Sequence, residues 1–112
     1  MNWNSLTDLA QLEQIKEESK LHPVLILKHS TTCSISATAL NRLERNYKPE
    51  LAGNLKPYYL DLLAYRPISN QIAQTFDTEH QSPQILLIKD GECVYTDSHF
   101  GISFNGILAN LS

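Results

Sequence analysis

The sequence predicts an α/β protein with a mixed central sheet of four to five strands and helices on both faces. Two unbroken apolar runs, Val24–Leu27 and Ile85–Ile88, are typical of buried strands. Helical patterns alternate with the strands, which favours helix-linked strands. Asp90-Gly91 is the clearest two-residue hairpin signal, and it predicts an antiparallel pair late in the chain.

The first half of the chain predicts helix, strand and helix in that order. Thr7 or Asp8 can cap a helix that extends to about Ser19, and a strand follows over residues 23–29 after a proline start. After a loop at 30–32, a second helix is expected over Ser34–Tyr47, ending before Pro49. One side of this helix carries Ile35, Ala39, Leu40 and Leu43.

The second half predicts a strand, a helix, a hairpin and a last helix. Residues 55–63 alternate as a strand, and Pro67 opens a third helix whose inner face carries Ile68, Ile72 and Phe76. A polar loop over 78–83 leads to hairpin strands at 84–89 and 92–97. Ser103 can cap the final helix, which carries Ile107, Leu108 and Leu111.

Length and charge limit the classes of function. A chain of 112 residues fits one domain, expected to span residues 1–112. The net charge is −3 and the basic residues are scattered, so we expect neither a nucleic-acid partner nor a membrane partner. The N-terminus lacks the basic start and apolar stretch of a signal peptide, which favours a cytoplasmic protein.

The chain has two cysteines, Cys33 and Cys93, and four histidines. A structural disulfide is not expected in the cytoplasm. No histidine pairs with a cysteine at zinc-finger spacing, so we expect no metal site. His80 and His99 are interpreted as exposed polar residues rather than catalytic bases.

Cys33 is the main candidate for chemistry because it directly precedes the predicted second helix. The thiolate is the reactive form, and the free N–H groups and partial positive charge of a helix N-terminus stabilise it. A fall in pKa from about 8.5 to about 6 would raise the thiolate fraction at neutral pH from about 3% to about 90%. Ser36 could add a hydroxyl donor, and Thr32 and Ser34 make the setting polar.

The residues alone leave a second interpretation open, in which Cys33 is a small buried hydrophobe. The polar neighbours and the strand-to-helix turn count against it, because loops at the ends of parallel strands form sites. Lys28 and His29 lie near Cys33 in sequence, but adjacent strand residues face opposite ways, so at most one can point toward it. Cys93, in the return arm of the hairpin, is interpreted as structural or incidental.

Several features together resemble a known fold and family. The element order, the cysteine at a strand end and Ser82-Pro83 before the hairpin resemble the thioredoxin fold. The stretch Lys28-His-Ser-Thr-Thr-Cys-Ser-Ile-Ser36 resembles the K-H-S-T-x-C-P-I-S stretch of the YtxJ family, the monothiol bacilliredoxins. The resemblance extends over nearly the whole chain through Trp3, Ser82-Pro83-Gln84, Ser98-His99 and Ile102-Ser103.

One residue departs from the family pattern, because Ser34 stands where the family has proline. A proline at the first helical position fixes the turn. Serine loosens that constraint and adds a hydroxyl near the sulfur, so it can change the pKa and the reduction potential.

The resemblance implies reduction of mixed disulfides between client proteins and the low-molecular-weight thiol bacillithiol, with no other cofactor. It implies that Cys33 is the nucleophile, that Pro83 is a cis proline opposite it and that the Ser82 backbone positions the partner. We therefore predict a cis Ser82–Pro83 bond. Because Ser36 occupies the resolving position, no disulfide can close within the motif, and a second small thiol must complete the cycle.

Two other functions remain possible from the sequence. Iron–sulfur carriers of the monothiol glutaredoxin type also have serine three residues after a single cysteine, but they typically show C-G-F-S and a later Gly-Gly. Here the motif reads Cys33-Ser-Ile-Ser36 and no Gly-Gly occurs. The other is a non-catalytic thioredoxin-like binding module with an inert Cys33, which a thiol pKa near the ordinary value of about 8.5 would favour.

Overall fold

The structure is a computed structural model that describes residues 1–111; Ser112, the last residue of the expected domain, lies outside it. In chain order the elements are β1 (Asn4–Ser5), α1 (Ala10–Glu18), β2 (Val24–His29), α2 (Ser34–Asn46), α3 (Pro49–Ala52), β3 (Lys56–Asp61), α4 (Arg66–Thr75), β4 (Gln84–Lys89), β5 (Glu92–Ser98), the 3₁₀ turn η1 (His99–Gly101) and α5 (Phe104–Ala109). None of the helices in this part of the chain is long and apolar enough to cross a bilayer.

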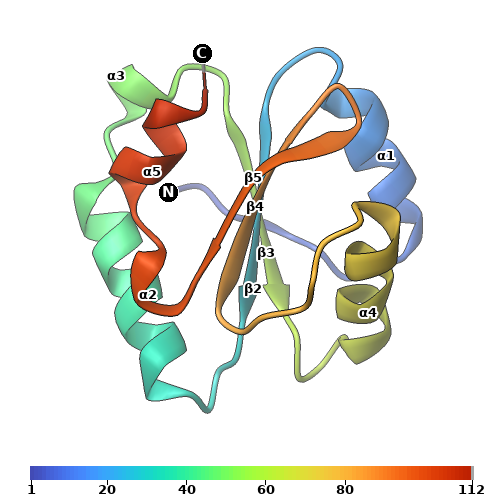
Figure 1. The fold of residues 1–112 in the computed structure, drawn as a ribbon, viewed down its shortest axis with the longest axis horizontal. Coiled ribbons are helices and arrows are strands. Elements are labelled where there is room, and N and C mark those ends of the chain that lie inside the picture. Colours follow the sequence, from blue (N-terminus) through green and yellow to red (C-terminus); the bar gives the residue numbers. More distant parts are fainter. Residues whose placement is uncertain (112) are drawn as a thin grey trace.

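The five strands form one mixed sheet in the order β1-β3-β2-β4-β5. The first three are parallel, and β4 and β5 run antiparallel to their neighbours. Figure 1 shows the sheet nearly edge-on, with α1 and α4 on one face and α2, α3 and α5 on the other. The predicted mixed sheet with helices on both faces is confirmed.

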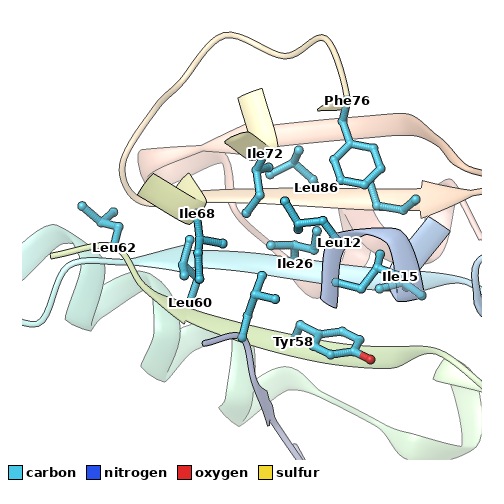
Figure 2. Packing of buried hydrophobic residues seen from close by; sticks show 13 residues of the cluster. Leu12, Ile15, Ile26, Tyr58, Leu60, Leu62, Ile68, Ile72, Phe76 and Leu86 are labelled. Atoms are coloured by element: carbon cyan, nitrogen blue, oxygen red, sulfur yellow. The ribbon is translucent and has the colours of Figure 1, made fainter. Parts of the chain in front are cut away.

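Strand pleating divides the apolar residues between two cores. On β2, Val24 and Ile26 face α1 and α4, whereas Leu25 and Leu27 face α2 and α5. Figure 2 shows the first core, in which Ile68, Ile72 and Phe76 pack over the sheet as their helical spacing predicts. Burial of each large aliphatic side chain stabilises the fold by about 1.5–3 kcal/mol. Since β2 is buried on both faces, any polar side chain it carries needs internal partners.

The local signals at two element ends are confirmed. Asp90 and Gly91 have φ values of 52° and 77°, the left-handed pair that a two-residue hairpin turn requires. The Ser103 side chain accepts a hydrogen bond from the Gly106 N–H at 3.1 Å and so caps α5. At the start of α1 the N-cap residue is Leu9 and not Thr7 or Asp8, but Asp8 Oδ1 accepts from the Ala10 N–H at 2.9 Å.

One expectation about the second helix is wrong, and one short helix was not predicted. Ile35, assigned to its inner side, is 36% exposed, and the buried residues are Ser36, Ala39 and Leu43. The buried side of α2 therefore begins at a serine, Ser36, in the first turn of the helix. This part of the helix is covered by the loop that carries Cys33 and not by a hydrophobic surface. The short helix α3, which begins at Pro49, was not predicted.

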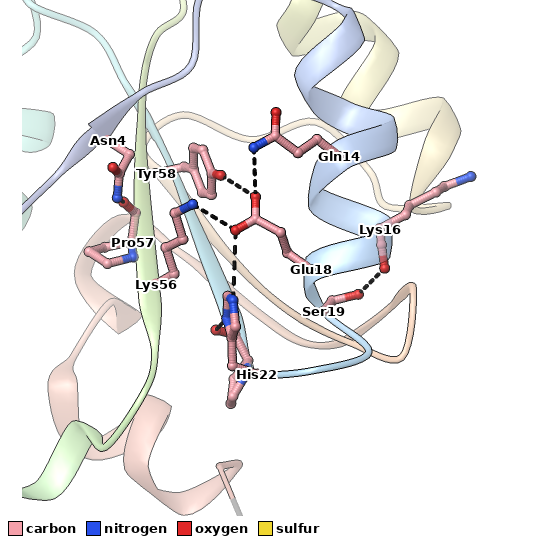
Figure 3. Close-up of polar contacts among 10 residues, drawn as sticks. Asn4, Gln14, Lys16, Glu18, Ser19, His22, Lys56, Pro57 and Tyr58 are labelled. Carbon is pink, nitrogen blue, oxygen red and sulfur yellow. Dashed lines mark hydrogen bonds and ion pairs between the residues drawn. The ribbon is translucent and has the colours of Figure 1, made fainter.

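A polar network closes the end of the sheet that lies far from the β2–α2 turn. Glu18 accepts hydrogen bonds from Lys56 Nζ at 2.6 Å, Tyr58 Oη at 2.5 Å and Gln14 Nε2 at 3.2 Å, and His22 Nε2 lies 3.7 Å away (Figure 3). The side chain of Glu18 is only 17% exposed. Burial alone would raise the pKa of Glu18, but the hydrogen bonds and the charge of Lys56 together lower it.

We expect Glu18→Gln to lower the free energy of unfolding by about 1–3 kcal/mol at pH 7, because charged hydrogen bonds are lost. A carboxyl whose folded-state pKa is lowered stabilises the protein above its unfolded pKa, and that stability is lost as the pH falls through the folded-state pKa. Urea unfolding across the acidic range should therefore show the difference shrinking toward low pH. A difference that stays constant into strong acid would contradict the role of the charge.

Candidate functional site

The sequence-predicted site residues gather at the end of the sheet where β2 finishes. Lys28 pairs with Gln84 across β2 and β4, so Pro83, one residue earlier, lies beside the end of β2. Its carbonyl accepts a hydrogen bond from the His99 N–H at 3.1 Å, which joins η1 to the same edge. The Ser82–Pro83 bond is cis, as predicted. In Figure 1 the connections after β2 and β3 and before β4 lie together at the lower edge.

Cys33 is the N-cap residue of α2. Its backbone is extended, with φ −104° and ψ 123°, and its carbonyl accepts the first helical hydrogen bond from the Ala37 N–H at 3.1 Å. Its own N–H donates to the Ser30 carbonyl at 3.2 Å, which closes the turn between strand and helix. An N-cap side chain lies where it can accept from the free N–H groups of the first turn. Cys33 holds this N-cap position and is partly exposed, although its sulfur forms no full capping hydrogen bond.

The helix amides control the ionisation of this thiol. The backbone N–H of Ser36, then that of Ile35, stabilise the thiolate and lower the pKa of Cys33, and the Ser36 hydroxyl adds to the effect. Partial burial opposes them, but the net shift is downward. A lowered pKa at a partly exposed position is the setting of a reactive cysteine and not of a buried structural one.

The three polar neighbours have different surroundings. Ser36 is fully buried, and its Oγ accepts from the Ser30 N–H at 3.4 Å while also facing the sulfur. Thr32 is exposed, and its hydroxyl lies 3.5 Å from that of Ser30. Ser34 is exposed and is the first residue of α2, so the helix begins at the residue that stands in place of the family proline.

Cys93 differs from Cys33 in place and environment. It pairs with Ile88, which pairs with Val24, so it lies level with the start of β2. The five residue steps from Val24 to His29, the end of β2, extend about 16 Å. A disulfide needs Cα atoms within about 7 Å, so a Cys33–Cys93 bond cannot form in this fold. Burial raises the pKa of Cys93, and its thiol donates to the Tyr95 carbonyl at 3.4 Å.

We expect substoichiometric iodoacetamide at neutral pH to alkylate Cys33 in preference to Cys93. The pKa of Cys33 is lowered by helix amides, whereas that of Cys93 is raised by burial. The alkylation rate of Cys33 should reach half its maximum at a pH below the ordinary cysteine value of about 8.5. Peptide mapping after a short pulse at several pH values measures both. Preferential alkylation of Cys93 would reject the site assignment.

Two residues at the end of β2 lie on opposite faces, as their alternation requires. His29 faces the α2 side, where its ring lies 5.4 Å from that of Tyr59; burial lowers its pKa, while the charge of Asp61 acts in the opposite direction. Lys28 faces the α4 side and is fully buried. His80 is exposed, as predicted, but its Nδ1 lies 3.2 Å from Lys28 Nζ, a contact that the sequence did not indicate. The sequence signal for this buried contact was the position of Lys28 directly after four buried aliphatic residues.

Comparisons with known proteins agree with this geometry. The family model described as monothiol bacilliredoxin BrxC matches residues 4–107. A solved structure described as having a thioredoxin fold is 32% identical with a TM-score of 0.82, and the match covers 96% of this chain and 92% of that one. Thioredoxin from Malassezia sympodialis is 17% identical (TM-score 0.75, 98% and 90% covered), and thioredoxin from Trypanosoma brucei brucei is 12% identical (TM-score 0.71, 96% and 88% covered). The last two show the shared fold.

Proposed function

The chain belongs to the monothiol bacilliredoxin family, and on that premise we propose that Cys33 is the nucleophile with which it reduces bacillithiol mixed disulfides. Family membership makes the chain a bacillithiol-dependent thiol–disulfide oxidoreductase. The observation that carries the assignment is the place of Cys33 at the N-cap of α2, where the N–H groups of Ser36 and Ile35 favour the thiolate.

The reaction takes two exchange steps. The Cys33 thiolate attacks the bacillithiol sulfur of a client mixed disulfide; a new S–S bond forms, the old one breaks, and the client leaves as a thiolate that takes a proton from water. A second bacillithiol thiolate then attacks the bacillithiol sulfur of the adduct. This step releases bacillithiol disulfide and restores the Cys33 thiolate. One disulfide bond is consumed and one is formed over the two steps: the client sulfur is reduced to a thiol, and the sulfur of the incoming bacillithiol is oxidised as it enters bacillithiol disulfide.

We assign supporting roles to the residues around the sulfur. The buried Ser36 hydroxyl supports the thiolate without being able to displace the adduct. Thr32 and Ser34 place hydroxyl groups on the exposed rim, where they can contact the small thiol. The Ser82–Pro83 segment, which enters β4 beside the end of β2, positions the client chain.

The clients are proteins carrying a mixed disulfide with the small thiol, and we place the reaction in the cytoplasm. Thiol exchange needs a pool of reduced small thiol, which reducing compartments maintain. The two cysteines of this chain are both free thiols, which supports that setting.

The proposal is tested by incubating the reduced protein with bacillithiol disulfide and, in parallel, with glutathione disulfide, followed by intact mass and peptide mapping. We expect one bacillithiol adduct, located on Cys33, to form faster than the glutathione adduct. An adduct located on Cys93 would reject the nucleophile. Equal rates with both disulfides would reject bacillithiol as the preferred thiol.

A further inference from the structure

A fully buried lysine lies under the loop that precedes Pro83. Lys28 is 0% exposed, on the α4 face of β2. Its Nζ donates to the Ser69 carbonyl at 3.2 Å and to His80 Nδ1 at 3.2 Å. The Ser69 hydroxyl lies 3.4 Å from the same histidine nitrogen, so lysine, serine and histidine form one cluster.

Stability does not account for this lysine. Within residues 1–111 Lys28 forms no ion pair, so its charge is compensated only by a carbonyl and an imidazole nitrogen. Burial lowers the pKa of Lys28 to about 8, so it still carries its charge at neutral pH. An apolar side chain of similar length avoids this desolvation, and such replacements of buried charges are often neutral or stabilising.

The contacts of Lys28 join three segments around the exchange site. Lys28 itself is the second-last residue of β2, and the turn that carries Cys33 follows that strand. Ser69 belongs to the first half of α4. His80 belongs to the loop over residues 77–82, which leads into the Ser82–Pro83 bond. The ammonium is therefore a tether between the strand before the nucleophile and the loop before the cis proline.

We propose that Lys28 is a positioning residue, which holds the 77–82 loop through His80 and thereby fixes Ser82–Pro83 for client binding. The inference rests on the proposed roles of Cys33 and of the Ser82–Pro83 segment. The direction of this hydrogen bond is fixed, because a charged lysine can only donate, and Nδ1 can accept only when the imidazole is neutral. Burial, and then the charges of Lys28 and Arg66, lower the pKa of His80, which favours the neutral ring.

If Lys28 positions the client, its loss should slow the reaction with a client more than it changes the reactivity of the Cys33 thiol. The Cys33 thiolate is stabilised by the amides of α2, which packs on the other face of the sheet from Lys28. Removal of the ammonium should therefore slow exchange with a peptide that must lie along Ser82–Pro83. It should leave the reaction of Cys33 with iodoacetamide, which needs no such binding, almost unchanged.

The main test is Lys28→Met, which keeps an unbranched apolar stem. We expect the second-order rate of bacillithiol release from a bacillithiolated peptide to fall roughly ten- to a hundredfold, the range that misplacement by about 1 Å produces. The alkylation rate of Cys33 should change less than about twofold, since the helix N-terminus remains. In NMR titrations the pKa of His80 should rise toward the ordinary histidine value, because the neighbouring charge is gone.

A second variant tests the loop end of the tether. His80→Ala removes an exposed side chain, so it should fold even if Lys28→Met does not, and it should give a similar loss with the peptide. The double variant should be no slower than the slower single variant, because both remove the same contact. Lys56→Met is the matched control: it removes a lysine from the Glu18 network at the other end of the sheet, and its peptide rate should stay at the wild-type value.

Three results would overturn the positioning role. These are a wild-type peptide rate in folded Lys28→Met, a wild-type peptide rate in His80→Ala, or a fall in the alkylation rate as large as the fall in the peptide rate. The proposed function would be rejected by a different result, namely bacillithiol release that persists in Cys33→Ser. The two hypotheses are thus rejected by different variants in the same assay.

Discussion

Cys33→Ser is expected to reduce the release of bacillithiol from a client mixed disulfide to the uncatalysed rate. A serine hydroxyl is not ionised at neutral pH and cannot form the S–S bond that the first step requires. Serine is a preferred N-cap residue, so the variant should keep α2 and lose no more than a few tenths of a kcal/mol of folding free energy. The loss of activity would then report chemistry and not unfolding.

The measurement follows the liberated client thiol under saturating bacillithiol, with thermal unfolding of each variant recorded alongside. Cys93→Ser is the matched control, because it makes the same substitution at the partly buried cysteine on the hairpin. It should retain the wild-type rate. Activity that persists in Cys33→Ser and disappears in Cys93→Ser would reverse the assignment of the nucleophile.

The layers of the fold could be predicted because the sequence signals for them are local. The strands β2 and β4 are short apolar runs that α-helical periodicity does not explain, and Asp90-Gly91 specifies the hairpin that joins β4 to β5. Residues 55–63 were predicted to alternate, and in β3 Tyr58 and Leu60 face α1 and α4 whereas Tyr59 packs against the other core.

Other features depended on tertiary contacts that no local signal contains. Ile35 has the spacing of an inner residue, but it lies in the first turn of α2, where the helix extends beyond the core and the side chain is 36% exposed. The helix α3 has only four residues, too few to give a periodic pattern.

The candidate site was predicted on the β2–α2 side and missed on the α4 side. The N-cap position of Cys33 and the nearness of Ser36 follow from sequence distance alone, since residues three apart share a helix face. Lys28 and His80 are 52 residues apart and meet only because β4 lies beside β2. The lysine was visible as a charged residue after a buried run, but its partner depends on the register of two strands.

Ser36→Cys should convert the monothiol site into one that closes an internal disulfide. Ser36 is the third residue of α2, and its hydroxyl already faces the Cys33 sulfur. A thiol there can attack a Cys33 adduct without a large backbone movement, displacing the small thiol. Burial of the position and loss of the acceptor for the Ser30 N–H should lower the free energy of unfolding by about 1 kcal/mol.

The readout is intact mass after oxidation with bacillithiol disulfide. The wild-type protein should accumulate one bacillithiol adduct, because nothing within reach displaces it. Ser36→Cys should instead lose the adduct and appear two hydrogens lighter than its reduced form. Ser34→Cys is the matched control: it adds a thiol at an exposed serine next to Cys33, where adjacent helical side chains do not face each other, and it should keep an adduct.

The same experiment sets the monothiol mechanism against its nearest rival, in which Cys93 resolves the adduct. A wild-type monomer that forms a Cys33–Cys93 disulfide in good yield would show that the hairpin cysteine is the resolving thiol. That bond would require the two ends of β2, about 16 Å apart, to come within disulfide distance, so the sheet itself would have to open. Two features therefore support the monothiol mechanism. The strand register keeps Cys93 away from Cys33, and Ser36 leaves the resolving position without a thiol.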